Sequence, residues 1–166
     1  MTRAGTGKVS MAKRSVSRER LEFIKKDYER GFIKYCGYKA MDASWGRFQS
    51  LVEITPDHRQ QDGFIHAGVI ATMADHTAGY SAFTTVPERV QILTIEFKIN
   101  FLRPAFGEAL ICNSRVIREG RQVIVSESEV LDVRERGEEA LVAKAMVTLM
   151  AVPVAKLTRG ENPPAG

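Results

Sequence analysis

The segment from Val69 to Phe83 constrains the fold more than any other part of the chain. Its residues predict a long helix that is apolar on nearly every face. Small residues make this helix unusually slim: Ala71, Ala74, Ala78, Gly79 and Ala82. Because a helix that is apolar all round must be covered on most sides, the rest of the chain is expected to wrap around it.

The residues after this helix predict four strands separated by short turns. The expected strands are Val90–Phe101, Ala109–Ile117, Gln122–Val133 and Ala140–Val152. In the first of them, apolar residues alternate with polar ones from Ile95 to Phe101, which is typical of a half-buried strand. Strands joined by hairpin-sized turns must pair antiparallel.

The residues before the long helix predict a second helix and two more extended segments. Ser17 can cap a helix that carries Leu21, Ile24 and Tyr28 on one face. Extended structure is expected over residues 32–44 and 47–54, with a turn at Trp45-Gly46 between them. The sequence thus predicts an α+β domain in which a curved antiparallel sheet of about six strands surrounds one long helix. The expected divisions are a basic tail at 1–16, a single domain at 17–152 and a C-terminal tail at 153–166.

The net positive charge of the chain comes from its N-terminus and not from the domain. Lys and Arg number 24 against 20 Asp and Glu. Residues 1–20 hold six of these basic residues and one acid, which leaves the remainder with a formal charge near −1. The chain contains no apolar run long enough to span a membrane and no apolar segment of a secretory signal. We therefore expect a cytoplasmic protein with neither nucleic acid nor membrane as its partner.

The turn before the long helix offers free backbone donors. Gly63 and Gly68 bracket His66 where loop becomes helix. The first N–H groups of the helix, beginning with Ala67, therefore point outward and can bind an anion or a carbonyl oxygen. Nine residues after His66, Asp75 interrupts the apolar helix. A carboxylate there costs free energy unless partners satisfy it, so Asp75 is either functional or a buried hydrogen-bond partner of the sheet.

These residues resemble the hotdog-fold acyl-CoA thioesterases of the phenylacetate-degradation (PaaI-like) type. The resemblance rests on Gly-Phe-Ile-His-Ala-Gly at 63–68, Asp75, and a strand ending in Asn-Phe-Leu-Arg-Pro at 100–104. It covers about residues 32–152 and implies the hotdog fold and cleavage of acyl-CoA to a free acid and CoA. Asp75 would act as general base or as nucleophile. The N–H of Ala67, which replaces a glycine of the family, would donate to the thioester oxygen.

Further positions match the family by their spacing. Gln60 stands where relatives carry a side-chain amide, and Thr94 stands where some carry a hydroxyl that holds the attacking water. Arg103, Gly120 and Arg121 suit the phosphates of CoA, although a solvated turn explains the last two equally well. No cofactor or metal is expected, since CoA is part of the substrate and the two cysteines form no ligand pattern.

Ala67 and Asp75 cannot meet at one carbonyl within a single helix, because eight residues span about 12 Å along its axis. We therefore expect a homodimer with antiparallel helices and shared active sites, and assembly into a tetramer. Two rival functions remain open. In a hotdog enoyl-CoA hydratase or dehydratase His66 would be essential, whereas a noncatalytic acyl-CoA sensor would use the same pocket without chemistry.

Overall fold

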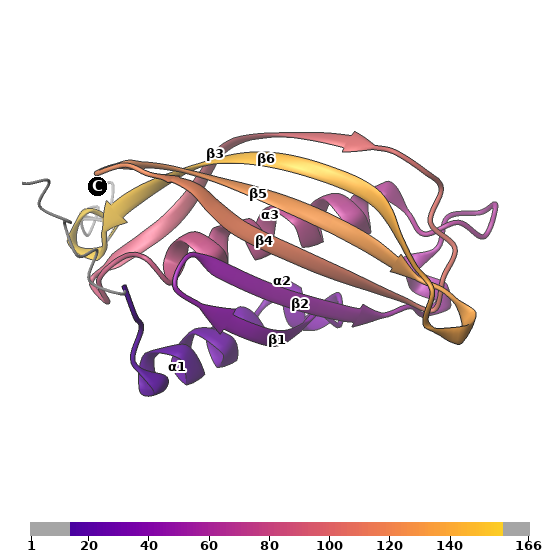
Figure 1. Cartoon of the computed structure of the whole chain (residues 1–166), viewed down its shortest axis with the longest axis horizontal. Helices are drawn as coiled ribbons and strands as arrows, with labels where there is room; N and C mark the ends of the chain where they lie inside the picture. The colour runs from indigo at the N-terminus through magenta and orange to yellow at the C-terminus, as the bar shows by residue number, and fades with distance from the viewer. Residues whose placement is uncertain (1–13, 158–166) are drawn as a thin grey trace, which may run out of the picture.

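A computed structural model describes residues 14–157 and shows one six-stranded antiparallel sheet with a central helix. The sheet order is β1-β2-β4-β5-β6-β3, and every neighbouring pair is antiparallel (Figure 1). The strands are β1 Lys39–Ser44, β2 Arg47–Glu53, β3 Val90–Phe101, β4 Ala109–Glu119, β5 Val123–Val133 and β6 Glu139–Pro153. The helices are α1 Arg18–Tyr28, α2 Phe32–Tyr35 and α3 Ala67–Phe83, with 3-10 turns at Pro56–His58, Glu135–Gly137 and Val154–Lys156. The predicted α+β hotdog architecture is confirmed.

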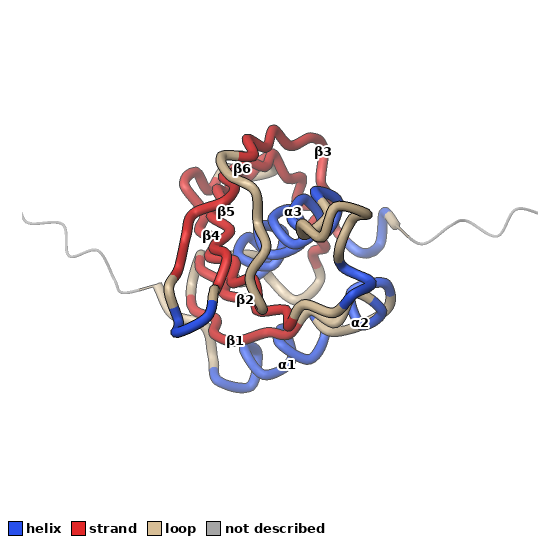
Figure 2. The backbone as a smooth tube through the Cα atoms, turned by 90° about the vertical axis from the view of Figure 1, so that its right-hand side faces the viewer, coloured by secondary structure: helices blue, strands red, loops and turns tan. Residues whose placement is uncertain are grey.

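Helix α3 lies inside the curve of the sheet. In the end-on view of Figure 2 the strands arc around it, and α1 and α2 lie beside the β1 end of this arc. Its fully buried residues include Met73, Ala74 and Ala78. Small side chains let the sheet approach the helix closely, as its slim sequence predicted. Residues 1–13 and 158–166 of the two expected tails lie outside the described residues.

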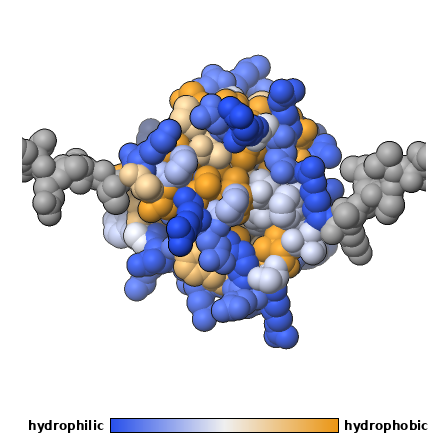
Figure 3. All heavy atoms as spheres, turned by 90° about the vertical axis from the view of Figure 1, so that its left-hand side faces the viewer, coloured by the Kyte–Doolittle hydropathy of each residue, from blue (hydrophilic) through white to orange (hydrophobic). Residues whose placement is uncertain are grey.

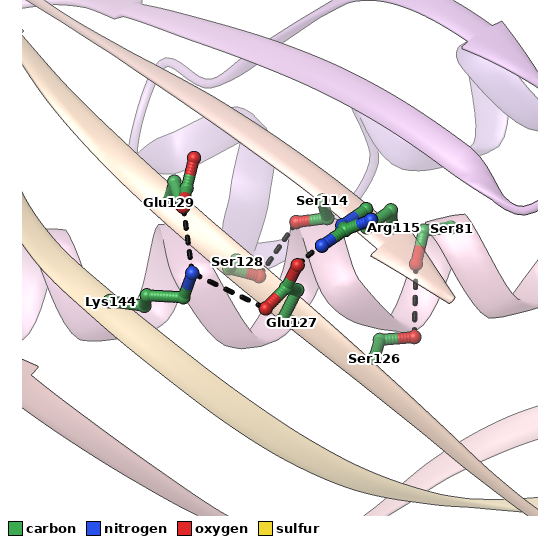
Figure 4. Close-up of polar contacts among 8 residues, drawn as sticks. All are labelled: Ser81, Ser114, Arg115, Ser126, Glu127, Ser128, Glu129 and Lys144. Atoms are coloured by element: carbon green, nitrogen blue, oxygen red, sulfur yellow. Dashed lines mark hydrogen bonds and ion pairs between the residues drawn. The ribbon is translucent and has the colours of Figure 1, made fainter. Parts of the chain in front are cut away.

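Hydroxyl groups line the contact between α3 and the sheet. Ser128 of β5 donates to the carbonyl oxygen of Ala74 at 2.7 Å, and Ser81 of α3 donates to Ser126 at 3.1 Å. Between these serines Glu127 points to the other face of the sheet, where it pairs with Arg115 and Lys144 (Figure 4). The strand thus keeps its period of two, and its buried polar atoms find partners.

The predicted N-terminal helix is confirmed, whereas the strand predicted directly after it is partly wrong. Ser17 caps α1 by accepting a hydrogen bond from the N–H of Arg20 at 3.2 Å. The extended structure expected over 32–44 is wrong for its first part, because Phe32–Tyr35 forms the short helix α2. Gly31 and Gly37, at φ of 57° and 76°, turn the chain sharply on both sides of it. Apolar composition alone could not distinguish this turn from a strand.

Strand β3 has the predicted bounds but not the predicted burial. Its apolar residues are largely exposed in the single chain, with exposed fractions of 50% for Ile95, 40% for Phe97 and 49% for Phe101. Within residues 14–157 β3 pairs with β6 alone, so its other edge is open. The expected half-buried strand is therefore wrong for one chain, since within residues 14–157 these three side chains stay largely uncovered.

Candidate active site

Asp75 lies in the middle of α3 and faces the start of β3. The hydroxyl of Thr94 donates to Asp75 Oδ1 at 2.8 Å. No hydrogen bond within residues 14–157 engages Asp75 Oδ2. A pocket of about 230 Å³ surrounds the pair, and its lining consists of Asp75, His76, Gly79, Tyr80, Phe83, Gln91, Ile92 and Thr94. One carboxylate oxygen is therefore held while the other is available to a ligand.

Burial raises the pKa of Asp75 above its ordinary value, and the hydrogen bond from Thr94 lowers the pKa in part. Burial has this effect because the charged form loses solvation. The ionised form of a carboxylate with a raised pKa is a stronger base than an exposed carboxylate. The environment of Asp75 thus suits proton abstraction or nucleophilic attack.

The start of α3 is held by the imidazole of His66. Its Nδ1 accepts a hydrogen bond from the N–H of Gly68 at 2.8 Å, which makes His66 the N-cap of the helix. In the neutral ring the proton must then reside on Nε2. A Cβ on Gly68 would come within 2.9 Å of the same Nδ1, so glycine is needed for this cap. Gly63, at φ of 83°, supplies the turn that leads into it.

The N–H of Ala67 is left free by this cap. No hydrogen bond within residues 14–157 occupies it, and the residue is exposed. It opens onto a second pocket of about 360 Å³, whose lining consists of Gln60, Phe64, Ile65, Ala67, Ile70, Phe101, Leu102, Arg103, Pro104 and Ala105. The structure therefore brings together three of the predicted site residues, Gln60, Ala67 and Arg103.

Two residues that the sequence analysis missed fix the loops around this second pocket. The guanidinium of Arg59 donates to the carbonyl oxygens of Gly63 and Gly107, both at 2.9 Å. Asp132, fully buried, accepts from the N–H of Gly107 at 2.8 Å and also contacts Arg134. Asp132 lies near the end of a strand that also carries Glu127 and Glu129, so the sequence gives no signal that separates this fully buried acid from the other two.

Gly120 and Arg121 lie at the other end of the sheet from Arg103. They form the turn between β4 and β5, on the left in Figure 1. A Cβ on Gly120 would meet the carbonyl oxygen of Val123 at 2.3 Å, so only glycine fits there. Figure 3 views this end directly and shows long hydrophilic side chains around smaller apolar areas. A single chain therefore does not gather all three predicted phosphate-binding residues.

The four predicted catalytic residues form two separate groups within one chain. Asp75 and Thr94 share one pocket, Gln60 and Ala67 share the other, and no residue lines both. In the described range no cluster of three or more His, Cys, Asp or Glu side chains could hold a metal ion. Over residues 14–157 no helix is long and apolar enough to cross a membrane.

Comparisons with known proteins find one family. The profile described as "Thioesterase superfamily" matches residues 62–138. A Halobacterium salinarum protein named "Putative esterase" is 31% identical over 108 residues, which cover 62% of this chain and 71% of that protein. A crystal structure of a thioesterase family protein from Silicibacter pomeroyi matches with a TM-score of 0.76 and 32% identity, over 80% of this chain and 98% of the other. The PaaI protein of the E. coli phenylacetic acid degradation operon matches with a TM-score of 0.70 and 20% identity, over 83% and 96% of the two chains, which shows a shared fold alone.

Proposed function

The chain belongs to the thioesterase superfamily, and from that membership we propose that it hydrolyses acyl-CoA thioesters in the manner of the PaaI-like type. The observation that carries the proposal is the Asp75 carboxylate, which has one oxygen bound by Thr94 and the other open to a pocket. Water supplies the hydroxyl of the product acid, and CoA leaves as the thiol.

Asp75 can perform the first step in two ways. As a general base it takes a proton from water, whose oxygen then attacks the acyl carbon. As a nucleophile it attacks that carbon itself, and water then cleaves the resulting anhydride. In both routes the hydrogen bond from Thr94 orients the carboxylate, so the proposed role of Thr94 is to position Asp75.

The turn before α3 supplies the complementary part of the site. The unoccupied N–H of Ala67 would bind the oxyanion that forms when the carbonyl is attacked, an effect of about 10² to 10³ in rate for one donor. Gln60 lines the same pocket and would orient the substrate or water through its amide. The cap formed by His66 fixes the direction of this N–H.

Two chains would complete each site. About 12 Å of helix axis separates Ala67 from Asp75, which is too far for both to reach one carbonyl. With antiparallel helices, Ala67 of one chain would face Asp75 of the partner subunit, and the exposed apolar edge of β3 offers the surface for this pairing. The same arrangement would bring Arg103 towards the other chain's β4–β5 turn, so both could hold the CoA phosphates. Sedimentation distinguishes the dimer from the tetramer that we expect.

The cap at the start of α3 favours hydrolysis over the hydratase or dehydratase chemistry. That chemistry needs an imidazole that takes a proton from the substrate. Nδ1 of His66 accepts the N–H of Gly68, so in the neutral ring Nε2 carries the proton and neither ring nitrogen has a free lone pair to act as the base.

A thiol-release assay across a panel of acyl-CoA substrates tests the proposal. Wild-type protein should release CoA, and Asp75→Asn should lower kcat by about 10² to 10⁴, the usual contribution of a general base. Tight binding of acyl-CoA without turnover would instead identify a sensor. Hydration of an enoyl-CoA with no thiol released would identify a hydratase.

A further inference from the structure

We propose that Gly79 opens an acyl-binding pocket one helical turn beyond Asp75, with room for a single ring or a chain of similar bulk. This inference rests on the proposed thioesterase function and assigns the class of acyl group that the site accepts. Neither the packing nor the backbone conformation of the single chain requires glycine at position 79.

Gly79 lies in the interior of α3, where glycine disfavours the helix relative to alanine. Its backbone has no positive φ that would demand glycine. A Cβ built at this position would meet no atom of the described chain within 4 Å, so close packing does not demand glycine either. What the missing side chain provides is open space.

That space adjoins Asp75. Residues four apart lie on the same face of a helix, and Gly79 and Asp75 line the same pocket. Its volume of about 230 Å³ exceeds the roughly 150 Å³ of an apolar cavity that admits benzene. With the acyl carbon at Asp75, the acyl group extends one helical turn along this pocket towards Gly79.

The far wall of this pocket is aromatic and fixed. The hydroxyl of Tyr80 donates to Asp27 Oδ2 at 2.8 Å, and its ring packs against His76 and Phe83 at centroid distances of 4.8 and 5.7 Å. The guanidinium of Arg20 lies 4.5 Å from the centre of the Phe83 ring. Because these contacts fix the two rings in place, the size of the side chain at position 79 determines the volume of the pocket.

The test compares benzoyl-CoA with acetyl-CoA as substrates of Gly79→Ala and Gly79→Leu. The ratio of kcat/KM for benzoyl over acetyl should fall at least about tenfold in Gly79→Leu, since misfit of one or two methylenes in a pocket changes discrimination by about 10 to 200-fold. Gly79→Ala should show a smaller fall. It should also raise the melting temperature by about 2 to 4 °C through its helix propensity.

Glu22→Leu is the control for added apolar bulk, because Glu22 is exposed on α1 and lines neither pocket. Its benzoyl-to-acetyl ratio should stay close to that of the wild type. An unchanged ratio in Gly79→Leu overturns the assignment, as does a Gly79→Leu protein that sediments as a monomer while the wild type is a dimer. Wild-type protein that hydrolyses no acyl-CoA overturns the proposed function itself, which separates the two failures.

Discussion

Replacing Ala67 by proline removes the proposed oxyanion donor while leaving the fold intact. Ala67 is the first residue of α3, the position at which proline is most favoured in helices. The preceding residue, His66, has φ −63° and ψ 135°, an extended conformation that a following proline accepts. Because the N–H of Ala67 makes no hydrogen bond within residues 14–157, the substitution breaks none there.

The expected magnitudes follow from this geometry. The stability of the protein should change little or rise by about 0.4 to 1 kcal/mol, since proline restricts the unfolded chain and the native backbone already fits it. The value of kcat should fall by about 10² to 10³, the loss measured when a single oxyanion donor is removed elsewhere. Ala67→Gly, which keeps the N–H, is the control and should retain most of the activity. Thermal unfolding and thiol release measured on the same preparations separate the two effects.

Mixing the Ala67→Pro chain with an Asp75→Asn chain tests whether the site is shared. Random reassortment of equal amounts makes half of the dimers heterodimers. Each heterodimer carries one site in which both defects meet and one site with neither, so about a quarter of the wild-type activity should return. Verified heterodimers that stay inactive would refute the shared site. An Ala67→Pro protein with kcat within about threefold of wild type would refute the oxyanion role of this N–H.

Two further substitutions test the residues that hold the site. Thr94→Val removes the hydrogen bond that lowers the pKa of Asp75, so this pKa should rise further. Because the reaction needs the ionised carboxylate, activity is lost as pH falls through that pKa, and the acidic limb of the kcat profile should move to higher pH; Thr94→Ser should leave it in place. Asp132→Ala should destabilise the protein to urea by about 3 to 5 kcal/mol, because it leaves the buried N–H of Gly107 and the Arg134 cation unpaired. Glu129→Ala, which breaks the more exposed pair with Lys144, should cost under about 1 kcal/mol, and equal losses in the two variants would contradict this account of Asp132.

The sequence predicted the fold well where local patterns and turn lengths decide it. The bounds of β3 agree with the prediction, and α3 begins two residues earlier than expected, at Ala67. The short helix α2 was missed because four residues of mixed polarity carry no periodicity that could separate a helical turn from a strand. The two glycines around it were the available signal.

The candidate site was predicted as a set of residues but not as an arrangement. Spacing along α3 already required Asp75 and Ala67 to be far apart, and the structure places them in separate pockets. The loop contacts of Arg59 could not be predicted, because its carbonyl partners at Gly63 and Gly107 are backbone atoms, which leave no mark in the sequence. The exposure of β3 was missed because an alternating pattern indicates an apolar face without showing that the described chain covers it.

A comparison with the buried Asp132 shows why Asp75 stands apart as a candidate for chemistry. Asp132 accepts hydrogen bonds from two backbone N–H groups and contacts Arg134, so both of its oxygens are engaged and its charge is compensated. Among the residues that the structure describes, 14–157, Asp75 has a single hydroxyl as its partner and no cation, and its second oxygen opens onto a pocket. A carboxylate that only stabilised the fold would be expected to have partners like those of Asp132. A buried carboxylate with too few hydrogen bonds or cations lowers the stability of the folded protein. A substrate and its attacking water would thus supply the partners that Asp75 lacks.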